Sequence, residues 1–292
     1  MDAIKSLKIL VTGANGQLGR SILDVSKDFP QFEYHFKTSK DLDITDFDRV
    51  KELFHKENFD YCINCAAYTA VDKAESEKEK AFMINAEAVG NLAEVCLAYN
   101  VILLHISTDF VFDGTKTSPY TEEDEPNPIN VYGASKLKGE RYIQELLNKY
   151  FIIRTSWVYS EYGHNFVKTM LRLAREREEI NVVNDQIGSP TYAGDLAEVL
   201  MTIITSGSDE YDLYHYSNDG EISWYDFAVR IFKEFKKNNL VFPMSTIDYP
   251  TAALRPDYSV LHKSKIEKIL RIEIHDWRNG LRNARISAVF PR

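Results

Sequence analysis

Apolar runs and amphipathic segments alternate along the first half of the chain. The run from Lys8 to Thr12 is typical of a strand, and the segment from Arg20 to Val25 is typical of an amphipathic helix. The alternation continues with strands predicted at 32–37, 61–66 and 101–107 and helices predicted at 47–57 and 78–99. Because strands that alternate with helices form parallel sheets covered by helices, we expect an α/β fold with a doubly wound parallel sheet.

The predicted strand at 101–107 is nearly continuous in apolar residues, as a strand buried on both faces should be. Ser107, Thr108 and Asp109 stand at its carboxyl end. Open α/β sheets bind their ligands at this edge. We therefore expect the functional site near these three residues.

Three glycines spaced by three residues follow the first predicted strand, in the segment Gly13-Ala-Asn-Gly-Gln-Leu-Gly19. Glycines between a strand and a helix let the backbone approach a pyrophosphate, which the free N–H groups and positive dipole end of the helix attract. The pattern favours a dinucleotide site of the Rossmann type. An ordinary strand-to-helix connection is the alternative.

The 292 residues exceed what one compact core usually holds. No linker rich in proline, glycine or serine divides the chain, and we find no internal repeat. We expect a Rossmann-type cofactor domain formed by residues 1–156 with parts of about 180–215 and 240–258. A smaller, mostly helical lobe would comprise about 157–179, 216–239 and 259–292.

Composition and charge narrow the possible classes of protein. A formal net charge of −9 argues against a general nucleic-acid surface. The amino terminus leads directly into the first predicted strand, and no apolar stretch approaches the roughly 20 residues that span a bilayer. We therefore expect a cytoplasmic protein without a membrane or nucleic-acid partner. The three cysteines, Cys62, Cys65 and Cys96, suit a reducing compartment, and buried packing is favoured over metal or redox chemistry.

A tyrosine and a lysine stand four residues apart in Tyr132-Gly-Ala-Ser-Lys136. On a helix, this spacing places both side chains on one face. An ammonium beside a phenol eases its ionisation, which helps to move a proton to or from a carbonyl oxygen. With the glycine turn, the pair indicates a nicotinamide-dependent oxidoreductase. In isolation, Tyr132 would be a surface tyrosine at a helix start.

Further motifs give the chain an almost end-to-end resemblance to a known family. The motifs are Asn64-Cys-Ala-Ala-Tyr-Thr-Ala-Val-Asp-Lys-Ala-Glu75, Ser107-Thr-Asp-Phe-Val-Phe-Asp-Gly114, Pro128-Ile-Asn-Val-Tyr-Gly-Ala-Ser-Lys136, Arg154-Thr-Ser-Trp-Val-Tyr159, Asn165-Phe-Val-Lys-Thr-Met170 and Asn184-Asp-Gln-Ile-Gly-Ser-Pro-Thr191. On these motifs the chain resembles the extended short-chain dehydrogenase/reductases and, within them, the dTDP-4-dehydrorhamnose reductase family.

The resemblance implies a reductase that converts dTDP-4-dehydro-6-deoxy-L-mannose to dTDP-L-rhamnose by hydride transfer to C4. Tyr132 would give its proton to O4, Thr108 would hydrogen-bond the same oxygen, and Lys136 would hold the nicotinamide ribose. We expect Lys136 and the oxidised nicotinamide to lower the pKa of Tyr132 from its usual value of about 10.

For the cofactor, the resemblance implies contacts from the glycine turn, from neighbouring strand ends and from the catalytic helix. Asp43 and Ile44 would bracket the adenine, with a helix cap at Thr45 or Asp46 as the alternative role of that segment. Asn85 would support the catalytic lysine through water, or be a packing exception. The full set is Gly13, Asn15, Gly16, Gln17, Leu18, Gly19, Asp43, Ile44, Ala66, Ala67, Tyr68, Asn85, Tyr132 and Lys136.

The end of the second predicted strand bears on the choice between NAD and NADP. A carboxylate there binds the ribose 2′-hydroxyl, whereas basic or small polar groups admit a 2′-phosphate. The chain runs His35-Phe-Lys-Thr-Ser-Lys40 with no acid before Asp41. We expect NADPH to be the better donor and leave NADH open as a second one.

The resemblance places most substrate contacts on the smaller lobe. Trp157 would be an aromatic platform for the sugar, with a core tryptophan as the alternative, and Arg255 would pair with the diphosphate. The run from Arg172 to Glu179 is more typical of a solvated helix face than of a binding patch. The full set of substrate-binding residues is Thr108, Asp109, Trp157, Asn165, Lys168 and Arg255.

Some members of this family dimerise through magnesium bound by glutamates. The matching positions here are Ser21 and Gly194, which lack the carboxylate oxygen that magnesium prefers. We therefore expect no metal site and either a monomer or a homodimer without a metal bridge.

Two other classes of function stay open at this point. One is another nucleotide-sugar 4-ketoreductase, or an epimerase or dehydratase of the same superfamily. A 4,6-dehydratase would carry an Asp-Glu pair after Thr108, where this chain has Asp109 and Phe110. The other class is a non-catalytic regulator resembling the beta subunit of methionine adenosyltransferase, against which the intact Thr108, Tyr132 and Lys136 weigh.

Overall fold

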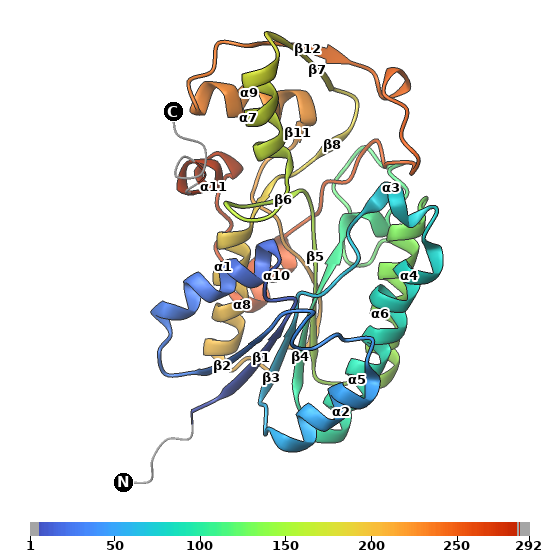
Figure 1. Ribbon diagram of the computed structural model, residues 1–292, viewed down its shortest axis with the longest axis vertical. Coiled ribbons are helices and arrows are strands. Elements are labelled where there is room, and N and C mark those ends of the chain that lie inside the picture. Colours follow the sequence, from blue (N-terminus) through green and yellow to red (C-terminus); the bar gives the residue numbers. More distant parts are fainter. Residues whose placement is uncertain (1–5, 285, 287–292) are drawn as a thin grey trace.

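A six-stranded parallel sheet forms the centre of the molecule, in the order β10-β5-β4-β3-β1-β2 (Figure 1). The computed structural model describes residues 6–284 and 286. The order reverses between β1 and β3, so the sheet is doubly wound, as the alternating pattern predicts. The strands are β1 Lys8–Thr12, β2 Glu33–Lys37, β3 Tyr61–Asn64, β4 Ile102–Thr108, β5 Tyr150–Thr155 and β10 Asp212–His215.

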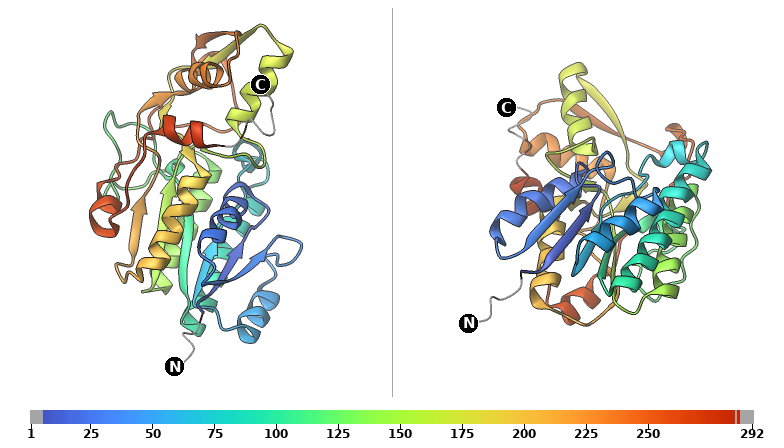
Figure 2. Two further views of the ribbon diagram at one scale, coloured as in Figure 1. Left: turned by 90° about the vertical axis from the view of Figure 1, so that its left-hand side faces the viewer. Right: turned by 60° about the horizontal axis from the view of Figure 1, so that its bottom comes forward.

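Helices cover both faces of this sheet, which explains why its central strands are largely apolar (Figure 2). Ile9 and Val11 point to one face, and Leu10 points to the other. The first face is covered by α1 Gln17–Val25, α8 Ala193–Ser206 and α10 Ser264–Leu270; the second is covered by α2 Phe47–Lys56, α5 Ala88–Tyr99 and α6 Val131–Leu146.

Two of the predicted strands end at different residues in the structure. β3 ends at Asn64 because the chain turns there, and the Asn64 side chain accepts the Ala66 amide at 3.2 Å. Cys65 therefore lies beyond the strand, while Cys62 is buried within it. β4 extends to Thr108, whose hydroxyl then caps the short 3₁₀ helix η3 (Asp109–Val111).

The helix predicted at 78–99 forms with those bounds, but it is more apolar than the sequence analysis allows for. Residues Lys78–Tyr99 form 22 continuous helical residues, long and apolar enough by length and composition to cross a membrane. The run consists of α4 Lys78–Phe82, a π-helical turn at Met83–Glu87 and α5. The expectation that no stretch approaches this length is thus wrong. Much of the run is buried against α6 and α2, as in the core helix of a folded domain.

A smaller lobe lies beyond the carboxyl edge of the sheet, at the top of Figure 1. Its core contains Phe227, Ile231 and Trp277, packed with side chains from α7 and β7. The elements of this lobe are α7 Phe166–Glu176, β7 Glu179–Val183, α9 Trp224–Glu234, β12 Leu240–Met244 and α11 Trp277–Asn283. Two-residue strands link it to the larger domain: β6 Val158–Tyr159, β8 Ile187–Gly188, β9 Thr191–Tyr192 and β11 Ile222–Ser223.

The packing differs from the predicted division of the chain at two places. Residues 240–244, placed with the cofactor domain by sequence, form β12, which pairs with β7 of the smaller lobe. Helix α10, placed with the lobe, packs instead against β10 of the central sheet. The local sequence of short segments such as these does not indicate which element they pack against, because many partners would bury them equally well.

Candidate active site

The carboxyl ends of β1, β3 and β4 meet where the strand order reverses. Thr12, Asn64 and His105 occupy paired positions on these three neighbouring strands. The Thr12 hydroxyl donates to Asn64 Oδ1 at 2.6 Å, so a buried hydrogen bond spans the point of reversal. In open α/β sheets this crevice is where ligands bind.

The backbone of the glycine turn is packed so closely that a ligand could approach its main chain. Gly13 has φ +61°, and a Cβ atom there would stand 2.6 Å from the Ala66 nitrogen. A Cβ atom at Gly19 would stand 2.6 Å from the Gly13 carbonyl oxygen. Gly16 precedes α1 and offers no side-chain cap, so no side chain competes for the first N–H groups of that helix.

The other members of the predicted turn have separate environments. Asn15 is exposed, whereas the Leu18 side chain is buried in the core. Gln17 reaches the smaller lobe: its amide donates to the Val158 carbonyl at 3.3 Å, and its oxygen accepts from Asn165 at 2.8 Å. Because the Leu18 side chain is packed in the core, Leu18 could contact a cofactor only through its backbone.

Helix α6 brings Tyr132 to the end of β4. Asn130 caps the helix by accepting from the Gly133 amide at 2.7 Å. Gly133 has no room for a side chain, since a Cβ atom there would stand 2.0 Å from the Phe110 carbonyl oxygen. This close approach brings the Tyr132 phenol within hydrogen-bonding reach of the Thr108 hydroxyl.

The pKa of Tyr132 is shifted opposite to the expectation from sequence. Burial and the negative charge of Asp109 raise it to about 12, while the hydrogen bond with Thr108 acts to lower it. Lys136 does not lower the pKa of Tyr132 here, because its amine bonds to Ile106 and contacts His105. Burial also raises the pKa of Asp109 to about 6. This carboxyl is 2% exposed and accepts the Thr108 hydroxyl at 3.0 Å, so it lies behind Thr108.

Lys136 lies on the same face of α6, one turn after Tyr132, and is 2% exposed. Its Nζ donates to the Ile106 carbonyl at 2.6 Å and lies 3.1 Å from His105 Nε2. Burial lowers the pKa of Lys136 to about 8. Sequence reasoning missed His105, although a histidine within an otherwise apolar buried strand was a usable signal.

The Asn85 side chain bonds directly to the Tyr68 backbone and to Ser135. It lies in the π-helical turn, accepts from the Tyr68 amide at 2.8 Å, and donates to the Tyr68 carbonyl and to Ser135 Oγ, each at 3.0 Å. All its hydrogen bonds in the described structure go to these two residues. Asn85 thus fixes the segment after β3, at Tyr68, against α6.

The adenine segment is part turn and part core. Asp43 is exposed, and its carboxylate accepts from the amide and hydroxyl of Thr45 at 2.9 and 2.8 Å. Ile44 is buried. The cap of α2 is Asp46, which accepts from the Arg49 amide, so of the two predicted capping residues, Thr45 and Asp46, it is Asp46 that caps the helix.

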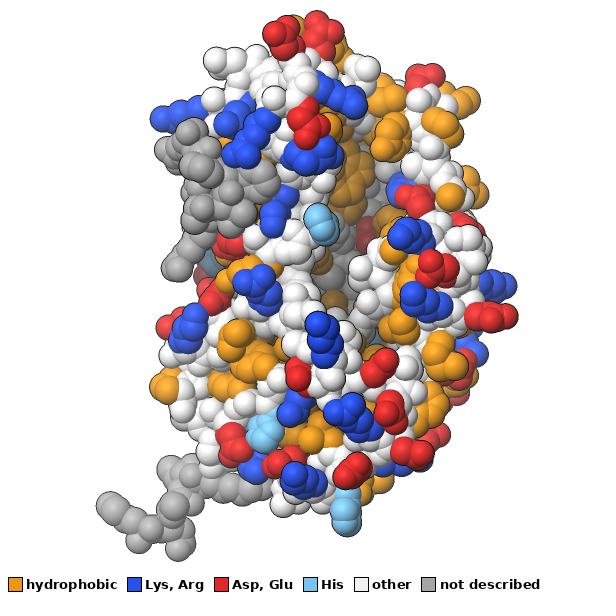
Figure 3. All heavy atoms as spheres, in the orientation of Figure 1, with side chains coloured by type: hydrophobic (Ala, Val, Ile, Leu, Met, Phe, Trp, Pro, Cys, Tyr) orange, Lys and Arg blue, Asp and Glu red, His pale blue; other side chains and the backbone are white. Residues whose placement is uncertain are grey.

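A cavity of about 680 Å³ lies between the two lobes, where Figure 3 shows a hollow. Phe110 and Trp157 line it, and Phe110 also contacts the Tyr132 ring edge-on at 5.9 Å. Phe110 therefore connects the cavity to Tyr132. Trp157 has φ +47° and stacks on Trp224 at 3.5 Å, so it is a strained aromatic residue at the cavity wall, not a residue of the central core.

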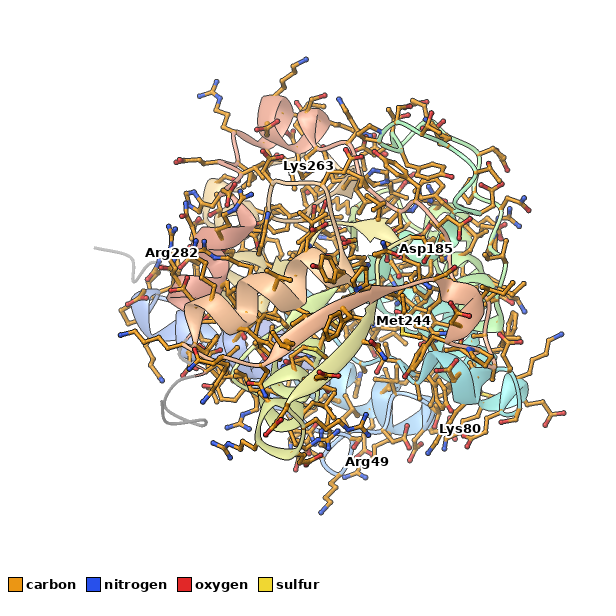
Figure 4. The ribbon with its side chains drawn as sticks, turned by 90° about the horizontal axis from the view of Figure 1, so that it is seen from above. Arg49, Lys80, Asp185, Met244, Lys263 and Arg282 are labelled. Atoms are coloured by element: carbon orange, nitrogen blue, oxygen red, sulfur yellow. The ribbon has the colours of Figure 1, made fainter. Side chains whose placement is uncertain are left out.

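Met244, the last residue of β12, lines this cavity, and Figure 4 shows it on the same side of the lobe as Asp185. The Asp185 carboxylate accepts from the amide and hydroxyl of Thr246, which fixes the end of β12. The loop after β12 continues to Tyr249 and Arg255, which also line the cavity.

Three further predictions for the smaller lobe have different outcomes. Asn165 caps α7, and Lys168 Nζ donates to the carbonyls of Glu161 and Gly163, so neither lines the cavity. Arg172 does pair with Glu176 one turn later, as predicted for a solvated face. Arg172 and Arg177 are exposed and also line the cavity, so part of this solvated run forms a wall of the cavity.

Arg255 lines the cavity and is held across its mouth. Its guanidinium donates to both oxygens of Asp72 at 3.1 and 2.8 Å and to the Ala253 carbonyl at 3.0 Å. Asp72 lies in the short helix α3 (Val71–Ala74) of the larger domain, and Arg255 lowers the pKa of its carboxyl. The pair therefore ties the two lobes together beside the cavity.

The two positions compared with a magnesium site lie on packed helices. Ser21 is buried in α1 and donates to the Gln17 carbonyl at 3.0 Å, while Gly194 begins α8. Among the described residues, no group of three or more histidine, cysteine or acidic side chains could hold a metal ion.

Comparison with known proteins agrees with this geometry. The family model described as the RmlD substrate binding domain matches residues 7–288. The dTDP-4-dehydrorhamnose reductase of Aggregatibacter actinomycetemcomitans is 44% identical, over 96% of this chain and 99% of the relative. The spore coat polysaccharide biosynthesis protein SpsK of Bacillus subtilis is 41% identical, over 94% of this chain and 95% of the relative.

Two solved structures are similar over nearly the whole chain. One is a dTDP-4-dehydrorhamnose reductase from Clostridium acetobutylicum, with a TM-score of 0.93 and 41% identity, covering 97% of this chain and 100% of the other. Another, from Bacillus anthracis in complex with NADP, has a TM-score of 0.91 and 42% identity, covering 95% and 98%. The chain therefore belongs to the dTDP-4-dehydrorhamnose reductase family of oxidoreductases.

Proposed function

We propose that this protein reduces dTDP-4-dehydro-6-deoxy-L-mannose to dTDP-L-rhamnose with NADPH. The observation that supports this most directly is the position of Tyr132 and Lys136 on one face of α6, with Lys136 buried and the Tyr132 ring in contact with Phe110 of the cavity wall. The names of the relatives agree with this substrate, and the NADP complex of the Bacillus anthracis relative agrees with the cofactor.

NADPH would lie over the carboxyl edge of the sheet, along the glycine turn. The turn fits a pyrophosphate because Gly13 and Gly19 let it pack closely on the Ala66 backbone and on itself, and because Gly16 leaves the first N–H groups of α1 without a side-chain cap. At the end of β2, Lys37, Ser39 and Lys40 would receive the 2′-phosphate. Asp41 is turned to Thr38, whose amide and hydroxyl it accepts at 3.0 and 2.6 Å. The adenine contacts of Asp43 and Ile44 and the contacts of Ala66, Ala67 and Tyr68 are part of the same proposal.

The bound cofactor supplies a hydride to C4 of the sugar, and the chain supplies the proton and the placement. Tyr132 would donate its proton to O4 as negative charge develops there. Its high pKa keeps the phenol protonated before the reaction, so it begins as an acid. Thr108 would hydrogen-bond the same oxygen after turning its hydroxyl away from Asp109. Lys136 would hold the nicotinamide ribose.

The sugar nucleotide would occupy the cavity between the lobes. Trp157, stacked on Trp224, would offer its ring to the sugar, and Arg255 would pair with the diphosphate. Arg172 and Arg177 provide further positive charge on the cavity wall. We propose a cytoplasmic enzyme that acts as a monomer or as a homodimer without a bridging metal.

The test of the function is NADPH oxidation by the purified protein with the 4-keto sugar nucleotide generated in place by the upstream enzymes. We expect oxidation with dTDP-L-rhamnose as the product, and a higher initial rate with NADPH than with NADH at equal low concentration. Intact NADPH binding without oxidation would contradict this substrate and favour another keto sugar nucleotide. A strong preference for NADH would contradict the assignment of the end of β2.

The ion pair of Arg255 gives a second test. Arg255→Leu should raise the KM for the sugar nucleotide about tenfold or more and change kcat less, because a charge-assisted phosphate contact is lost. Asp72→Asn serves as the matched control, since it breaks the same tie between lobes and leaves the arginine available. If both variants raised KM equally, Arg255 would serve only to join the lobes.

A further inference from the structure

A buried row of polar side chains connects Lys136 to the glycine turn. Thr12, Asn64 and His105 are paired positions on β1, β3 and β4, on the sheet face that α6 covers, and all three are buried. Asn64 Nδ2 lies 3.1 Å from His105 Nδ1, and His105 Nε2 lies 3.1 Å from Lys136 Nζ. The row therefore runs without a gap from Thr12 to the lysine amine.

The donors around Asn64 set the direction of every hydrogen bond in this row. Asn64 Oδ1 accepts the Thr12 hydroxyl at 2.6 Å and the Ala66 amide at 3.2 Å, so the amide nitrogen of Asn64 faces the imidazole. Because this nitrogen donates to His105 Nδ1, the neutral ring carries its hydrogen on Nε2. That N–H points at Lys136 Nζ, which accepts it only when the amine is unprotonated.

Protonating Lys136 reverses this arrangement. An ammonium has no lone pair, so His105 must then accept at Nε2 and carry its hydrogen on Nδ1. Asn64 must turn its oxygen toward the ring, and the Thr12 hydroxyl and Ala66 amide then lose their acceptor. Buried donors without partners are costly, so the row disfavours the charged lysine.

The other titratable groups facing Lys136 do not provide this control. Glu140 lies one turn along α6 and is held by Arg154 through a buried bidentate pair. Burial raises the pKa of the Cys65 thiol, so the thiol stays neutral. Burial and the nearby lysine lower the pKa of His105 well below its usual value, so the ring also stays neutral. His105 is thus the side chain in direct contact with the amine.

We propose that Asn64 and His105 are positioning residues. They hold the Lys136 amine against the sheet and make its protonation depend on the orientation of the buried Asn64 side-chain amide. The inference rests on the proposed role of Lys136. This control by Asn64 and His105 lets Lys136 change charge close to neutral pH, where the amine can exchange a proton during turnover. Ala66 lies beside the glycine turn, so the same amide also connects the cofactor cradle to the lysine.

The decisive measurement is the pKa of Lys136 in the cofactor-free protein, followed by NMR of ¹³C-labelled lysine, with the resonance identified by its absence in Lys136→Met. Asn64→Asp keeps an acceptor for Thr12 and Ala66 and places a second one against His105 Nδ1. The ring must then present Nε2 as an acceptor. We expect the pKa of Lys136 to rise by about one unit or more.

Two controls separate transmission through the ring from the added charge itself. The same Asn64→Asp change in a His105→Leu background should raise the lysine pKa by less than half as much. Asn91→Asp introduces a carboxyl at another buried asparagine, on α5, and should leave the lysine pKa unchanged. Equal shifts in the two backgrounds, or no shift in either, would overturn the proposal.

A milder variant guards against failure to fold. Thr12→Val is nearly isosteric and removes one of the two donors that hold the Asn64 amide, so the lysine pKa should rise by a smaller amount. No rise in this folded variant would also count against the proposal. The titration needs no turnover, so it can succeed even if the proposed substrate is wrong; failure of the proposed function would appear only in the NADPH assay.

Discussion

Replacing Tyr132 with phenylalanine should lower turnover about 10²- to 10⁴-fold while leaving the Kd for NADPH nearly unchanged. The change removes one hydroxyl, and with it the proton donor, but little volume. The phenol lies at the junction of Thr108 and the cavity wall, where O4 of the sugar would sit. Stopped-flow measurement of NADPH oxidation, with the Kd from fluorescence titration, separates the two effects.

Tyr142→Phe is the matched control for this experiment. Tyr142 lies on the same helix, and its hydroxyl bonds to Glu87 away from the cavity. We expect wild-type turnover from this variant. Near wild-type turnover in Tyr132→Phe would rule out the phenol as the acid and leave Thr108 with Asp109 as the remaining proton source beside it.

Lys136→Met should weaken NADPH binding and lower kcat together, with kcat reduced about 10²-fold or more. The methionine keeps most of the apolar stem, so the loss reports the amine. Lys138→Met is the control, since Lys138 lies on the same helix and pairs with Glu87 near the surface. Similar losses in both variants would indicate damage to α6 and not the loss of a contact with the ribose.

The pH dependence of NADPH binding gives the same assignment an independent check. Burial lowers the pKa of Lys136 to about 8, so the amine is charged below this pH and neutral above it. A charged amine makes the stronger hydrogen bond to a ribose hydroxyl, so the wild-type Kd should rise as the pH passes upward through about 8. This rise should be absent in Lys136→Met. A rise that persists in the variant would assign the titration to another group.

Features of the structure that depend on one element could be predicted well. Tyr132 and Lys136 share a helix face because of their spacing, and Gly13 and Gly19 permit a tight turn because they lack Cβ atoms. The parallel sheet followed from apolar strands alternating with amphipathic helices. Each of these inferences uses a period or a steric limit that the local sequence carries by itself.

Contacts between elements and the effects of burial could not be predicted in the same way. The sequence suggested that Lys136 would lower the pKa of Tyr132, but the fold turns the amine to His105 and Ile106 and raises the pKa of the phenol by burial. Arg172 was assigned to a solvated face, yet the packing of α7 also sets it in the cavity wall.

By itself the sequence determined the doubly wound sheet, the glycine turn and the Tyr132 and Lys136 pair, since each depends on neighbours within one element or one turn. Only the tertiary structure decided that Asn64 and His105 lie in register beside Lys136 and that Arg255 pairs with Asp72 across the cavity mouth. These contacts join segments far apart in the chain, and their charges depend on how completely packing removes water.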